Sequence, residues 1–215
     1  MTNLASSGTQ PPSRLLRRRQ DGVEANARLT ASVAVVLFVV LAAEGVTILR
    51  IRPLLTPHVF IGMLLVPPVV LKLGSTTWRF ARYYRGAPEY RRKGPPPIVL
   101  RLLGPVLVTL TLIVFASGIA LLLTPTAWHS QMLLLHKVSF ILWIAAMVIH
   151  VLGHLLDTTR LAPRDWMHRT RKEVRGAGLR QWSIAASLVF GLLLAFITVP
   201  EVGRWLVTGG FHPGG

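Results

Sequence analysis

Five apolar segments divide this chain of 215 residues, and each is long enough to cross the hydrocarbon core of a bilayer, which is about 30 Å thick. Inside lipid, every backbone N–H and C=O group must find its hydrogen-bond partner within the protein, so such segments fold as helices. The sequence therefore predicts an all-α integral membrane protein, a bundle of five transmembrane helices. The predicted helices span residues 29–49, 57–77, 98–123, 132–156 and 182–207.

Composition and charge narrow the class of protein. Hydrophobic residues make up 52% of the chain, yet its formal net charge is +16. Apolar spans joined by basic loops combine these properties, so we expect a lipid bilayer and no nucleic acid as partner. The chain has no cysteine, which excludes disulfides, thiolate-ligated iron–sulfur clusters and covalently attached c-type haem. Any redox centre would be held non-covalently, and histidine is the obvious ligand.

The loops between the apolar segments predict an orientation. Arginine and lysine are abundant before the first segment, after the second and after the fourth, whereas residues 124–131 contain neither. The positive-inside rule then places the N-terminus inside and the C-terminus outside. The predicted regions are a basic cytoplasmic tail (1–28), a four-helix core (29–156), a basic cytoplasmic loop (157–181), and a fifth helix with a short outer tail (182–215).

A spacing of fourteen residues recurs in four of the predicted helices. Fourteen residues turn an α-helix by about 1400°, which returns a side chain to within roughly 40° of its first direction and raises it by about 21 Å. Residues in such pairs therefore lie on one helix face at two depths of a bilayer. The pairs are Ala31 and Gly45, His58 and Lys72, Gly104 and Gly118, and His136 and His150.

With the predicted orientation, these residues form two layers. The inner layer contains Ala31, Lys72, Gly104 and His150, and the outer layer contains Gly45, His58, Gly118 and His136. Two neutral imidazoles on the second and fourth helices suit the two axial positions of a haem b iron. The two outer-layer glycines lie on the remaining helices, where a larger side chain would clash with the porphyrin.

These spacings, H-x13-H in the fourth helix and G-x13-G in the third, resemble the di-haem four-helix core of the cytochrome b superfamily. The resemblance covers residues 29–156. It implies iron ligation by His58 and His136, and by His150 at an inner haem. It also implies a stand-alone or subunit cytochrome b of the bacterial cytoplasmic membrane, with one haem b or two.

Lys72 departs from that pattern, because the superfamily has a second histidine ligand at this place. A lysine amine can coordinate iron only after it loses its proton. Three alternatives follow. Lys72 is an unusual ligand; or the inner haem uses His150 alone or with His154; or the inner haem is absent and Lys72 extends toward water or lipid phosphate.

Other interpretations of the same residues remain open. His150 and His154 are one helical turn apart and could form a metal pair, although only Asp157 follows nearby. The two outer-layer histidines could instead be interfacial residues without a ligand. Glu44 within the first helix either pairs with Arg50 or Arg52, or exchanges protons with a quinol near the outer layer.

We expect a haem-b-binding electron-transfer subunit rather than a stand-alone enzyme. It would exchange electrons between the quinone pool and an extracytoplasmic oxidoreductase partner. A haem-free membrane scaffold or assembly subunit is the alternative favoured by Lys72. A metal or solute carrier that uses His150, His154 and Glu44 is a third.

Overall fold

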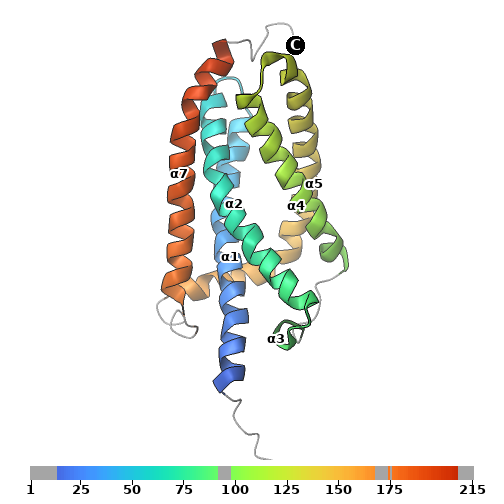
Figure 1. The fold of residues 1–215 in the computed structure, drawn as a ribbon, viewed down its shortest axis with the longest axis vertical. Helices are drawn as coiled ribbons and strands as arrows, with labels where there is room; N and C mark the ends of the chain where they lie inside the picture. Colours follow the sequence, from blue (N-terminus) through green and yellow to red (C-terminus); the bar gives the residue numbers. More distant parts are fainter. Residues whose placement is uncertain (1–13, 92–97, 168–173, 175, 208–215) are drawn as a thin grey trace, which may run out of the picture.

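The computed structural model describes residues 14–91, 98–167, 174 and 176–207 (Figure 1). Over these residues the chain is almost entirely helical and contains no strand. The elements are α1 (Arg14–Ile48), α2 (Leu55–Tyr84), the short α3 (Pro88–Arg91), α4 (Ile98–Leu123), a 3₁₀ turn (Thr126–Trp128), α5 (His129–Trp166) and α7 (Ala177–Val207).

Within the described residues, five helices are long and apolar enough to cross a membrane. Many of their large apolar side chains are exposed, as expected where lipid surrounds a bundle; Val39, Ile141 and Phe196 are each more than 60% exposed. The prediction of an all-α membrane protein with five spanning helices is confirmed.

Four of these helices surround a common interior, and the fifth lies outside them. α1 packs against both α2 and α5, and α4 packs against α5. α7 packs mainly along α2 and makes smaller contacts with α1 and α4 (Figure 1). The α1–α2 and α4–α5 connections lie at the end drawn at the top of Figure 1, which we call the upper end; α7 begins at the opposite, lower end.

A missing backbone donor and a glycine explain the close approach of α7 to α2. Pro68 has no N–H, so the carbonyl of Leu64, four residues earlier, lacks its usual helical partner. On α7, a Cβ added at Gly191 would lie only 2.3 Å from that carbonyl oxygen. Glycine therefore lets the α7 backbone pack directly on the carbonyl, an arrangement typical of membrane helix interfaces.

The helices extend beyond their predicted bounds at the lower end. The predicted tail 1–28 is helical from Arg14 onward, its earlier part lies outside the described residues, and α5 continues ten residues past 156 into the predicted loop. The boundaries were wrong because hydropathy detects only the apolar part of a helix. Arg28 is almost completely buried, contacts Glu24 at 3.1 Å and donates to the Arg164 carbonyl at 3.4 Å, which stabilises both extensions.

Candidate functional site

Two histidines from different helices meet inside the bundle near its upper end. His58 lies in the first turn of α2, and His136 lies two turns into α5. Their ring centres are 6.4 Å apart, and the ring planes are nearly perpendicular at 84°. Both side chains are partly buried. The structure thus brings together the two imidazoles that the fourteen-residue spacing placed in one layer.

The Nδ1 atom of His58 is held by α1. It lies 2.9 Å from Oε1 of Glu44 and 3.0 Å from Oγ1 of Thr47. The Thr47 hydroxyl donates its own hydrogen to the Glu44 backbone carbonyl at 2.6 Å, so its oxygen accepts from the imidazole. Both contacts therefore place the proton on Nδ1 and leave the Nε2 lone pair of His58 for a ligand.

The Nδ1 atom of His136 is held in the same way by α4. It lies 3.0 Å from the carbonyl oxygen of Val114 and 3.1 Å from Oγ of Ser117. The Ser117 hydroxyl donates to the Ile113 carbonyl at 2.6 Å, so its oxygen also accepts from the ring. His136 consequently carries its proton on Nδ1 as well, and its Nε2 lone pair is the one left for a ligand.

The two outer-layer glycines have different surroundings. A Cβ added at Gly118 would lie 3.1 Å from Cε1 of His136, so this glycine makes room for the imidazole itself. Among the residues that the structure describes, a Cβ added at Gly45 would meet nothing within 4 Å. Gly118 therefore positions a histidine, whereas Gly45 borders open space beside Glu44.

The predicted inner layer contains a hydrogen-bonded lysine. Nζ of Lys72 donates to the backbone carbonyl of Thr30 on α1 at 2.8 Å. Ser75, less than one turn further along α2, contacts the Thr30 hydroxyl at 3.1 Å, and Ala31 beside Thr30 is buried. Lys72 thus forms part of a polar contact between α1 and α2. Among the residues described, Asn26 completes this contact by donating to the Ser75 carbonyl at 3.1 Å.

The other inner-layer residues form no comparable pair. In the described structure, Nδ1 of His150 is buried and has no hydrogen-bond partner, and its ring lies 4.7 Å from that of His154. A Cβ added at Gly104 would meet nothing within 4 Å. The side chain of Asp157, the one acidic group considered for a metal pair here, lies outside the described part of the chain.

The described residues form no site for a metal ion held by protein side chains alone. Among the described residues, no group of three or more His, Cys, Asp or Glu side chains is placed to hold one. This includes the region around His58 and His136, where the third nearby candidate, Glu44, already bonds Nδ1 of His58.

Sequence reasoning missed the groups that orient the two histidines. Thr47, Ser117 and the Val114 carbonyl were not singled out, and Glu44 was expected to meet Arg50 or Arg52 rather than His58. The available signal was positional: Glu44 and Thr47 are three residues apart, hence on one helix face, and Ser117 directly precedes Gly118.

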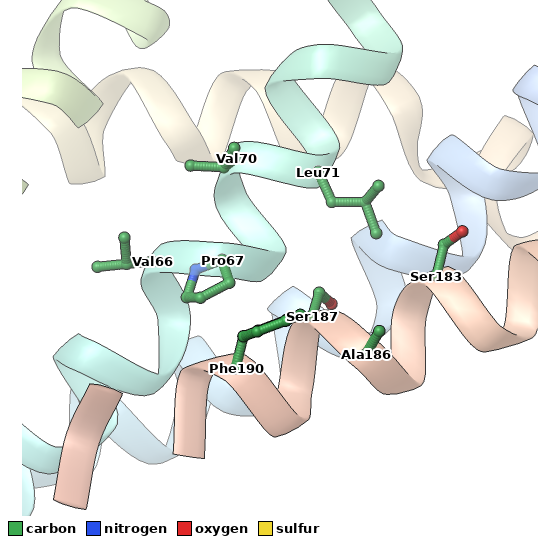
Figure 2. A pocket seen from close by; sticks show the side chains of 8 residues that line it. All are labelled: Val66, Pro67, Val70, Leu71, Ser183, Ala186, Ser187 and Phe190. Carbon is green, nitrogen blue, oxygen red and sulfur yellow. The ribbon is translucent and has the colours of Figure 1, made fainter. Parts of the chain in front are cut away.

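A shallow apolar groove runs between α2 and α7, below Pro67 (Figure 2). Its walls carry no charged or imidazole group, so it offers no chemistry of its own. The side chains that line it belong to Val66, Pro67, Val70, Leu71, Ser183, Ala186, Ser187 and Phe190.

Comparison with known proteins identifies no relative: no family model, no curated protein and no solved structure matches this chain.

Proposed function

We propose that this protein binds one haem b between His58 and His136 and transfers electrons in a membrane. One observation carries the proposal. The two imidazoles lie 6.4 Å apart, and each has its Nδ1 hydrogen bonded to the protein, so that each Nε2 is left to coordinate. Metal-ligating histidines commonly donate their second N–H to a carboxylate or a backbone carbonyl, and Glu44 and Val114 supply one of each here.

The separation of the rings fits one shared metal ion. An imidazole nitrogen binds a transition metal at about 2 Å, so two imidazoles on opposite sides of one ion have ring centres roughly 6 Å apart. The observed distance is 6.4 Å.

A porphyrin would supply the additional metal ligands that the two histidines do not provide. A metal ion held by protein side chains alone usually needs three or four ligands, and the described residues offer no such group. A haem iron already has four porphyrin nitrogens and requires only two axial ligands. The pair formed by His58 and His136 therefore suits haem b better than an isolated ion, and it favours a haem protein over a metal or solute carrier.

Each residue of the site would have a defined role. A bound haem would supply a one-electron redox centre, and His58 and His136 would hold its iron. Glu44 and Thr47 orient one imidazole, whereas Ser117 and the Val114 carbonyl orient the other. A haem iron held by two histidines would suit electron transfer rather than substrate activation. The protein is then an electron-transfer subunit and not a stand-alone enzyme.

The hydrogen bond of Lys72 supports a single haem per chain. Its Nζ donates to the Thr30 carbonyl on the neighbouring helix, and this position is the one where a second axial histidine would be expected. We propose that the inner layer holds no haem ligated by both Lys72 and His150.

The proposed cellular context follows from charge. Arg82 and Arg85 near the end of α2 and Arg160 and Arg164 of α5 lie at the lower end of the bundle. By the positive-inside rule this end faces the cytoplasm and the site of His58 lies toward the outside, in a bacterial cytoplasmic membrane. The haem would then exchange electrons between the quinone pool and an oxidoreductase on the outer face.

The deciding experiment is a reduced-minus-oxidised absorption spectrum of the purified protein, with a pyridine haemochrome count. We expect one haem b per chain, lost in His58→Ala and in His136→Ala. His129→Ala is the matched control, because His129 also lies near the upper end of α5 but bonds the Thr124 carbonyl. A wild-type protein that binds no haem when haem supply is adequate would overturn the proposal and favour a membrane scaffold.

A further inference from the structure

The two histidines of the site differ in the charge of the group that holds them. His58 donates to a carboxylate, that of Glu44, at 2.9 Å. His136 donates to neutral acceptors, the Val114 carbonyl and the Ser117 hydroxyl. Hydrogen bonds to an ionised acceptor are roughly twice as strong as those between neutral groups. The two imidazoles are therefore polarised unequally.

The position of the Glu44 carboxylate is built into the α1–α2 interface. Its side chain is only 13% exposed, and that of His58 is 20% exposed, so water screens their contact weakly. The Thr47 hydroxyl lies 3.5 Å from the second carboxylate oxygen. Across the interface, a Cβ added at Gly62 of α2 would lie in ordinary van der Waals contact with Oε1, at 3.5 Å, so α2 packs closely against the carboxylate.

We propose that Glu44 is a positioning residue that makes His58 the stronger axial ligand and lowers the reduction potential of the haem. This inference rests on the proposed haem site. A carboxylate that accepts the Nδ1 hydrogen increases the basicity of Nε2, and a more basic ligand favours the oxidised iron. The negative charge beside the iron acts in the same direction, because oxidation adds positive charge to the centre.

The test compares the midpoint potentials of full-length variants by spectroelectrochemical titration in one detergent and at one pH. Glu44→Gln keeps the shape and an acceptor oxygen but removes the charge. We expect its potential to rise above that of the wild type, and its affinity for haem to fall by roughly 10- to 100-fold. Ser117→Ala is the matched variant on the His136 side. It should shift the potential less, since the Val114 carbonyl still accepts from Nδ1.

A second variant keeps the inference testable if Glu44→Gln does not retain haem. Thr47→Val removes the hydroxyl that shares the Nδ1 hydrogen of His58 and leaves Glu44 as the acceptor. Its potential should then lie at or below that of the wild type. A rise in Thr47→Val would mean that any disturbance of this interface raises the potential, and it would overturn the inference.

The outcomes separate this inference from the proposed function. Haem that is present in the wild type and lost in His58→Ala, with a potential that Glu44→Gln leaves unchanged, overturns the role of Glu44 alone. An equal shift in Ser117→Ala and Glu44→Gln does the same. A wild type without haem overturns the site itself.

Discussion

Nζ of Lys72 on α2 donates a hydrogen bond to the backbone carbonyl of Thr30 on α1, over a distance of 2.8 Å. The bond joins two of the helices that are long and apolar enough to span a membrane. It connects a side chain expected to influence cofactor binding with a contact that stabilises the fold. If Lys72 stabilises the contact between α1 and α2, its substitution should lower stability; if it ligates iron, its substitution should lower haem content.

Lys72→Met should leave the haem content unchanged and lower the stability of the protein. Methionine retains the unbranched shape of lysine but cannot donate to the Thr30 carbonyl. An intramolecular hydrogen bond contributes about 0.5–1.5 kcal/mol, so a drop in the midpoint of thermal unfolding in detergent should be measurable. The pyridine haemochrome count should remain one haem per chain.

Lys137→Met is the control, because it makes the same substitution at a lysine that is exposed on α5. It should change neither quantity. A lower haem count in Lys72→Met, at unchanged folding, would show instead that Lys72 ligates iron.

The sequence predicted the spanning helices and the proximity of the two histidines, but not the groups that hydrogen bond to the histidines. Apolar length predicted five spans, and the fourteen-residue period placed His58 and His136 in one layer, where the structure shows them in proximity. Their role as iron ligands stays a prediction. The contact of Glu44 with His58 could not be predicted, because it depends on the rotation of α1 about its axis relative to α2.

The helix ends were missed for a related reason. Arg28 and Glu24 lie in a segment that composition identifies only as polar, and Arg28 is buried where it contacts Glu24 and the distant carbonyl of Arg164. A contact between residues so far apart in the chain leaves no periodic signal in either segment.

Gly118→Ala should weaken haem binding by displacing His136. The added Cβ would lie 3.1 Å from Cε1 of the imidazole, so the ring must move by a few tenths of an ångström. That movement disturbs the hydrogen bonds from Nδ1 to Val114 and Ser117. Overpacking of this kind costs about 1–3 kcal/mol. The ratio of haem to protein should fall in this variant, and the thermal midpoint should be measured on the same samples. An unchanged ratio would contradict the tight contact between Gly118 and His136.

Gly45→Ala tests the cofactor rather than the protein packing. In the described part of the chain, the Cβ that this substitution adds meets nothing within 4 Å, so the thermal stability of haem-free protein should not fall. It should rise slightly, because alanine is the better helix former by about 1 kcal/mol. If the porphyrin lies beside Gly45, the same variant should lose haem. If the variant retains all of its haem, Gly45 does not lie beside the porphyrin; the proposed role of the two histidines would be unaffected.

Gly191→Ala should separate α7 from α2 without affecting the histidines. Its Cβ would lie 2.3 Å from the Leu64 carbonyl oxygen, and a backbone atom cannot move aside as a flexible side chain can. The helices must therefore move apart, and we expect a clear decrease in the thermal midpoint. Gly203→Ala on the same helix is the control, since a Cβ there meets none of the described residues within 4 Å. Because α7 lies outside the four helices around His58 and His136, the haem spectrum of folded Gly191→Ala protein should match that of the wild type. A haem spectrum that changed together with the thermal midpoint would show that α7 supports the histidine site through its contact with α2.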